Sequence, residues 1–124
     1  MIGAVVISHG AFATELLRAA EIIVGRIEGV VAVDIAPAQG MEEIHAAAAG
    51  ASRTVEAGDG VLVLTDMFGG TPSNIGLSFL ATHRVEVVTG VNLPMMIKFP
   101  IARASMPLPE LARHLQGCGQ RNIT

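Results

Sequence analysis

Two side chains whose types could act together in chemistry each follow a strongly apolar segment of the chain. His9 comes at the end of the apolar run 2–8, and Asp66 comes directly after the run 60–65. Continuous apolar runs of this length are typical of strands buried on both faces. The glycine-rich segment 69–74 follows Asp66 almost at once. If the two strands are parallel neighbours, an imidazole, a carboxylate and a glycine-rich turn that opens a helix meet at one edge of a sheet.

This combination is suited to holding a phosphoryl group on histidine. A neutral imidazole has one acceptor nitrogen, and a carboxylate that accepts from the other ring N–H selects the tautomer and orients the ring. Such a charge-assisted hydrogen bond contributes about 1.5–3 kcal/mol. Backbone N–H groups at the start of a helix can receive phosphoryl oxygens. We therefore predict His9, Asp66 and Thr71 as catalytic residues, with phosphorylation at Nε2 of His9, and Gly69, Gly70 and Thr71 as phosphate-binding residues. We expect neither a metal ion nor an organic cofactor of the chain's own.

Strands and helices alternate along the sequence. Apolar and β-branched runs predict strands at residues 2–8, 30–35, 60–65 and 85–89, with a helix after each of the first three. Continuous apolar strands alternating with helices predict an α/β fold: an open, mostly parallel sheet in the order 2-1-3-4 with helices on both faces. From residue 95 we expect helix, with breaks near Pro100 and at residues 106–109. Residues 121–124 have the pattern of a strand that begins there, a candidate further edge strand.

Several apolar side chains are assigned expected positions by their spacing. In the first helix, helical spacing places one set toward the core, and Gly25 ends the helix. In the third helix, which Thr71 and Pro72 open, a second set forms the buried side. A third set lies near the expected crevice and is a candidate docking surface, with burial in the core as the alternative. The first-helix set is Phe12, Leu16, Ala19, Ala20 and Ile23. The third-helix set is Ile75, Leu77, Phe79 and Leu80. The candidate docking set is Met67, Phe68, Leu93, Met95 and Met96.

Composition limits the classes of protein and partner. The chain has 124 residues, enough for one domain over residues 1–124 but too few for two cores. Its net charge is −3, and it lacks Trp and Tyr, so nucleic-acid binding is not expected. No apolar run approaches the roughly 20 residues of a membrane span, and the lone cysteine, Cys118, fits a reducing compartment. We therefore expect a cytoplasmic protein without membrane insertion.

Three segments together resemble a known family. They are residues 8–10 (Ser-His-Gly), residues 64–74 (Leu-Thr-Asp-Met-Phe-Gly-Gly-Thr-Pro-Ser-Asn) and residues 89–95 (Thr-Gly-Val-Asn-Leu-Pro-Met). Over residues 1 to about 105 the chain resembles the IIA component (EIIA) of mannose-type phosphoenolpyruvate-dependent sugar phosphotransferase systems. The resemblance implies a cytoplasmic phosphotransferase that receives a phosphoryl group from the phosphocarrier protein HPr on the histidine matching His9. It then passes the group to a IIB component, here expected to be a separate protein.

The same resemblance implies further roles and an assembly. The aspartate matching Asp66 holds the ring, and the hydroxyl residue matching Thr71 lies beside the phosphate. The fold is a mostly parallel open α/β sandwich, commonly a homodimer, and members serve in sugar transport or in regulatory relays. Sugar specificity does not follow from the sequence.

Other functions remain as alternatives. A phospho-aspartate receiver needs an acidic pair after its first strand, where this chain has Ser8 and His9, and a histidine phosphatase needs nearby arginines, whereas Arg18 lies well into the first helix. Two alternatives stay open: a non-catalytic module for small-anion sensing or regulatory interaction, and a domain like the phosphotransferase subunit of dihydroxyacetone kinase. The remaining histidines, His45, His83 and His114, are assigned no role.

Overall fold

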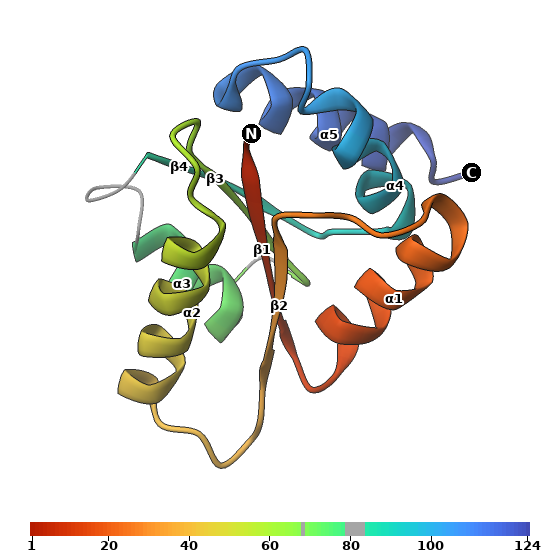
Figure 1. Cartoon of the computed structure of the whole chain (residues 1–124). Coiled ribbons are helices and arrows are strands. Elements are labelled where there is room, and N and C mark those ends of the chain that lie inside the picture. The colour runs from red at the N-terminus through yellow and green to blue at the C-terminus, as the bar shows by residue number, and fades with distance from the viewer. Residues whose placement is uncertain (68, 79–83) are drawn as a thin grey trace.

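Four parallel strands in the order β2-β1-β3-β4 form the centre of the fold (Figure 1). The computed structural model describes residues 1–67, 69–78 and 84–124. The α/β class, the strand order and the parallel pairing predicted from the sequence are confirmed. The elements are β1 (Gly3–His9), α1 (Phe12–Val24), β2 (Val30–Ile35), α2 (Met41–Val55), β3 (Val61–Thr65), α3 (Thr71–Ser78), β4 (Val85–Thr89), α4 (Leu93–Ala102) and α5 (Leu108–Arg121).

The two central strands place the candidate chemistry at one edge of the sheet. β3 is buried along its whole length, and β1 is buried up to the exposed His9 at its end. Their parallel register sets Ile7 opposite Thr65. His9 therefore ends β1 beside Asp66, which directly follows β3. This is the carboxyl edge of the sheet, where open α/β folds place their ligands.

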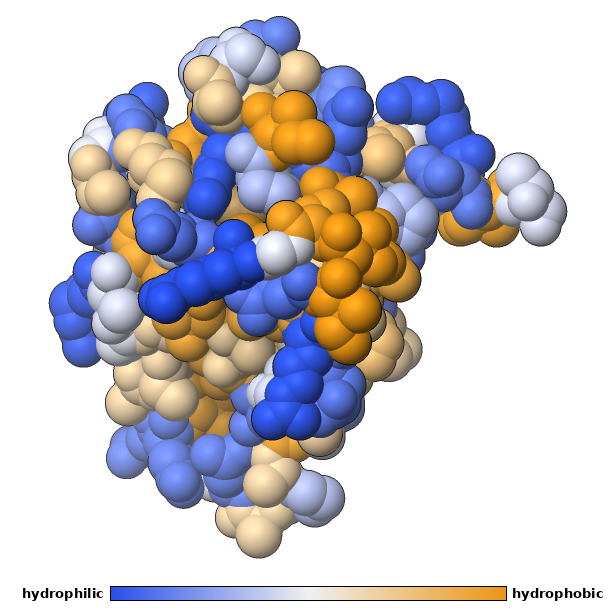
Figure 2. Space-filling view, turned by 45° about the vertical axis from the view of Figure 1, so that its right-hand side comes forward, coloured by the Kyte–Doolittle hydropathy of each residue, from blue (hydrophilic) through white to orange (hydrophobic). Residues whose placement is uncertain are grey.

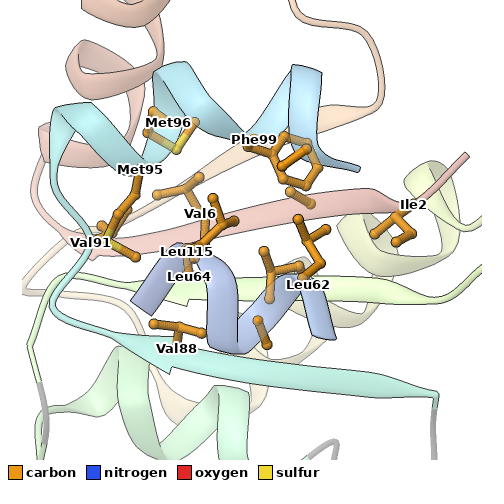
Figure 3. Close-up of a cluster of buried hydrophobic side chains, with 14 of the residues drawn as sticks. Ile2, Val6, Leu62, Leu64, Val88, Val91, Met95, Met96, Phe99 and Leu115 are labelled. Atoms are coloured by element: carbon orange, nitrogen blue, oxygen red, sulfur yellow. The ribbon is translucent and has the colours of Figure 1, made fainter. Parts of the chain in front are cut away.

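Helices cover both faces of the sheet, as predicted. Because side chains alternate along a strand, Val5 and Ile7 of β1 pack in the cluster with α2 and α3, while Ala4 and Val6 pack in the cluster with α1, α4 and α5. Figure 3 shows the second cluster, in which Met95, Met96 and Phe99 of α4 lie over side chains of the strands. Each cluster fixes the helices on its face relative to the carboxyl edge.

Helix α1 buries a narrower face than the sequence predicts. Its buried residues are Ala13, Leu16 and Ala20, a seam whose two alanines let the helix approach the sheet closely. The expectation that Phe12 and Ile23 face the core is wrong, since both are exposed. Figure 2 shows hydrophobic surface on the side of the molecule where α1 and α4 lie. The exposed apolar side chains of these helices are Phe12, Ile22, Ile23, Val24 and Ile101.

Two expectations about the carboxyl-terminal third are wrong. Pro100 lies inside α4 rather than breaking it, because the helix continues past the proline and buries Ala102. The candidate strand at residues 121–124 does not form, because α5 runs through Arg121 and the Asn122 side chain then donates to the Cys118 carbonyl at 2.8 Å. The break at residues 106–109 holds, since α5 begins at Leu108.

Some expectations fall outside the described residues. These are the burial of Phe79 and Leu80, the docking role of Phe68 and the setting of His83; the side chain of Leu77 is also not described. Ile75, from the same predicted face of α3, is buried. Within residues 1–67, 69–78 and 84–124, none of the helices combines the length and apolarity needed to cross a membrane.

Candidate active site

His9 and Asp66 are in direct contact although 57 residues separate them in the chain. The ring nitrogen Nδ1 of His9 lies 2.7 Å from Oδ2 of Asp66. The backbone N–H of His9 donates to the same oxygen at 2.9 Å. The side chain of Asp66 is only 16% exposed, whereas that of His9 is 54% exposed. The carboxylate is therefore enclosed, while the imidazole is open to a second molecule.

The charge of Asp66 fixes the tautomer of His9. Burial raises the pKa of Asp66, but the hydrogen bonds from the His9 amide and ring and the attraction of the ring outweigh it, so the pKa stays below its ordinary value. Asp66 is thus ionised at neutral pH and accepts the proton on Nδ1. In the neutral ring the lone pair is then on Nε2. The arrangement leaves Nε2 as the nucleophilic atom.

The backbone around His9 is tied to both neighbouring strands. The N–H of Gly10 donates to the Ile35 carbonyl at the end of β2, at 2.9 Å. Gly10 has a φ of 56°, in the left-handed region that glycine adopts readily, and this lets the chain turn from β1 into α1 directly after His9. His9 is therefore held from the β2 side through Gly10 and from the β3 side through Asp66.

The glycine-rich turn lies against the reactive side of the ring. A Cβ atom added to Gly70 would lie 3.0 Å from Cε1 and 3.6 Å from Nε2 of His9. Helix α3 then begins at Thr71, and the Gly70 carbonyl accepts its first helical hydrogen bond, from Asn74, at 3.0 Å. Gly70 rather than Thr71 thus occupies the capping position. Nε2 faces the amino terminus of α3, where N–H groups lack helical acceptors.

Of the five predicted site residues, the structure groups four. His9 and Asp66 are bonded, Gly70 lies against the ring, and Thr71 lines the same pocket as His9. Gly69 is exposed with a φ of 85°, and an added Cβ there would contact nothing. Gly69 therefore serves the turn, and its closeness to the ring is not shown.

An open pocket of about 340 Å³ borders the ring on its β2 side. Its walls are His9, Thr71 and apolar side chains at the end of β2 and the start of α2, including Ile35 and Ile44. The β2–α2 loop was not among the site residues predicted from the sequence. This loop could have been predicted as part of the site, because it follows β2 and so lies at the same edge of the sheet as His9.

The candidate docking set divides between core and surface. Met95 and Met96 are buried in the cluster shown in Figure 3, which confirms the core alternative for both, and Leu93 is partly buried against the same cluster. They pack inward because α4 lies against α1 and α5 on this side of the molecule. Met67 is 54% exposed beside the site and remains a candidate contact.

Sequence reasoning also missed two polar residues beside the site. Ser8 is fully buried, and its Oγ accepts from the N–H of Ala13 at 2.7 Å. Asp34, opposite Ser8 in the β1–β2 register, accepts from the N–H and hydroxyl of Thr14. Both therefore cap the first turn of α1. For Ser8 the available signal was a polar residue at the end of an apolar strand, next to a predicted helix start, whereas the role of Asp34 depends on the β1–β2 register.

Comparison with known proteins identifies the family. A family model described as "PTS system fructose IIA component" (PTS, phosphotransferase system) matches residues 3–116. The chain belongs to this family of mannose-type IIA components. It is 29% identical over 124 residues to the fructose-specific EIIA component of Bacillus subtilis, covering 99% of this chain and 85% of that protein. Family membership makes the chain a IIA component, a phosphotransferase component that carries phosphoryl groups in a sugar relay.

Two further relatives agree with this assignment. The mannose-specific EIIAB component of Escherichia coli K12 is 32% identical over 107 residues, which cover 86% of this chain but only 33% of that protein. The structure of a mannose/sorbose-specific IIA subunit from Enterococcus faecalis superposes with a TM-score of 0.89 at 30% identity, covering 98% of this chain and 92% of that one. These IIA relatives favour neither the anion-sensing alternative nor the dihydroxyacetone kinase alternative.

Proposed function

We propose that this IIA component carries its phosphoryl group on Nε2 of His9. The observation that carries the proposal is the 2.7 Å contact between Nδ1 of His9 and the enclosed Asp66 carboxylate, which leaves Nε2 as the free nitrogen of an exposed ring. The position of Gly70 against Cε1 and Nε2 supports it, because it places the start of α3 beside the phosphoryl group. Asp66 is the orienting residue in this proposal, and Gly70 and Thr71 lie beside the bound phosphoryl group.

The transfer step balances without a metal ion or an external base. The Nε2 lone pair attacks phosphorus, the bond from phosphorus to the donor's nitrogen breaks, and its electron pair stays on the donor. His9 keeps its proton on Nδ1 throughout, so the phosphorylated ring is cationic and Asp66 stabilises that charge. N–H groups near Gly70 and the Thr71 hydroxyl donate hydrogen bonds to the phosphoryl oxygens and so stabilise their negative charge. The reverse sequence passes the group on.

The partners follow from the family. We propose HPr as the donor and a IIB component as the acceptor, each approaching the exposed edge of His9 and the pocket between His9 and the β2–α2 loop. We also propose that residues 1–124 act as a single IIA domain and that the protein is a homodimer, as the family resemblance implies. The role, in transport or in regulation, depends on the acceptor.

Phosphoryl labelling tests the assignment directly. Purified protein is incubated with radiolabelled phosphoenolpyruvate, enzyme I and HPr, and the bound label is counted. We expect His9→Ala to take up no label, because the nucleophile is gone, and His45→Ala, on the exposed face of α2, to label as the wild type does. Label that persists in His9→Ala with the same acid lability would refute His9 as the carrier.

A further inference from the structure

A second pocket, of about 370 Å³, opens at the opposite edge of the sheet from His9. Ile2, Asp59 and Arg84 reach it from the segments just before β1, β3 and β4, and residues 103–108 close it from the link between α4 and α5. Its volume falls within the usual range for small-molecule sites. None of the residues proposed for phosphoryl transfer lines it. Two arginines do, and they give the pocket its chemistry.

Arg103 is a partly buried guanidinium without a carboxylate partner in the described part of the chain. Its Nη1 donates to the carbonyls of Ile2, at 3.2 Å, and Glu28, at 2.8 Å. Its carbon Cζ lies 4.9 Å from the centre of the Phe99 ring. Burial lowers the pKa of Arg103, with the Glu28 charge opposing, yet a guanidinium remains charged. The side chain is thus held in place with a positive charge that no described carboxylate within 4 Å balances.

Arg84 supplies a second positive charge from another wall. Within residues 1–67, 69–78 and 84–124, its Nη1 donates a long hydrogen bond, 3.4 Å, to the Gly58 carbonyl. The nearby Asp59 carboxylate is paired with the amino-terminal ammonium of Met1, which together with the charge of Arg84 holds the pKa of Asp59 low. Asp59 therefore accepts hydrogen bonds while another cation offsets its charge. The pocket has a net positive charge with one acceptor carboxylate on its wall.

We propose that this pocket binds a small phosphate monoester that also carries hydroxyl groups. Guanidinium groups match the geometry of phosphate oxygens and bind them by paired N–H donors, and Arg84 and Arg103 present such groups from two separate segments of the chain. Asp59 can accept a hydrogen bond from a ligand hydroxyl. A phosphorylated polyol or sugar satisfies both requirements, whereas inorganic phosphate satisfies only the first.

Amide chemical shifts of the uniformly ¹⁵N-labelled chain test the proposal, with glycerol 3-phosphate, inorganic phosphate and glycerol as probes. We expect saturable shifts at Ser105, Met106 and Leu108 with glycerol 3-phosphate, weaker ones with phosphate and none with glycerol. Loss of one charged hydrogen-bond donor weakens binding roughly tenfold, so this is the expected effect of Arg84→Gln. Arg113→Gln, on the exposed face of α5, is the matched control and should bind as the wild type does.

Arg103→Gln should weaken binding at least as much, but Arg103 also ties α4 to Ile2 and Glu28, so its replacement is expected to lower stability as well. Arg84→Gln is therefore the deciding variant. Shifts confined to Gly69, Gly70 and Thr71, no saturation with glycerol 3-phosphate, or equal affinities of Arg84→Gln and Arg113→Gln would each overturn the proposal.

Discussion

Helices α1 and α3 both begin at the carboxyl edge of the sheet, yet their amino termini are treated differently. In α1 the N–H of Ala13 donates to Ser8 and the N–H of Thr14 donates to Asp34. At the start of α3, no side-chain oxygen of the described residues accepts from the N–H groups of residues 69–71. One helix start is closed by side chains, and the other is left open beside His9.

The difference shows how one strand serves both structure and chemistry. Ser8 and His9 are consecutive residues of β1, and the alternation of side chains sends them to opposite faces. Ser8 closes α1 and so fixes the end of the strand, while His9 turns toward α3 and Asp66. Donors that are already satisfied add rigidity, and donors left unsatisfied stay available to an anion.

The two carboxylates next to β1 give the largest expected contrast. Asp66→Asn keeps an oxygen that can accept from both the N–H and Nδ1 of His9, so the fold should persist. It removes the negative charge that fixes the tautomer and stabilises the phosphorylated ring. We expect transfer from HPr to slow by at least about a hundredfold, measured by rapid-quench labelling. Asp34→Asn, the matched control, keeps its contact with Thr14 and should transfer within about twofold of the wild type.

Equal transfer rates for these two variants would contradict an orienting role for Asp66. Circular dichroism melts of both proteins separate a loss of charge from a loss of fold. If Asp66→Asn melts far below Asp34→Asn, the Asp66 carboxylate is mainly structural, and the contrast between the starts of α1 and α3 disappears.

Gly70→Ala tests how closely α3 approaches the ring, with an intermediate expected effect. The added Cβ would lie 3.0 Å from Cε1 of His9, so the ring must shift by a few tenths of an ångström against Asp66. Misplacement of a reacting group by about 1 Å can cost a hundredfold, so we expect a loss of roughly tenfold in transfer.

Gly50→Ala is the control for this substitution. Gly50 lies inside α2, and the nearest atom to an added Cβ there is Nη2 of Arg53, at 3.9 Å, an ordinary van der Waals distance. Transfer by this variant should match the wild type. A Gly70→Ala protein that transfers at the wild-type rate would show that the ring has room and that the start of α3 does not define the phosphoryl position.

The sequence predicts the sheet well because its strands carry a strong and simple signal. The runs before His9 and Asp66 are continuously apolar, and right-handed crossovers leave few possible strand orders. Contact between the two side chains then follows from pairing of β1 with β3. The predicted roles of both residues in transfer remain predictions until labelling is done.

Helix faces and capping are predicted less well because they depend on tertiary packing. The apolar spacing of α1 allows Phe12 and Ile23 to be buried as readily as Ala13. Which residues are buried is decided by the close packing of the helix on the sheet, which favours the small side chains of Ala13 and Ala20. Likewise, the roles of Ser8 and Asp34 follow from the β1–β2 register, which brings two polar residues together beneath α1. No local sequence pattern predicts the register between β1 and β2.

Ser8→Ala and Thr71→Ala form the smallest but most direct test of the closed and open helix starts. Ser8→Ala leaves the buried N–H of Ala13 without an acceptor, and we expect the free energy of unfolding in urea to fall by about 1–2 kcal/mol. Its transfer rate, measured on the folded protein, should change little.

Thr71→Ala removes a hydroxyl from the pocket beside His9. It should change stability by less than about 0.5 kcal/mol and slow transfer several-fold. The reverse pattern, in which Thr71→Ala lowers the free energy of unfolding and Ser8→Ala slows transfer, would contradict the contrast. It would show that side chains cap the start of α3 rather than the start of α1.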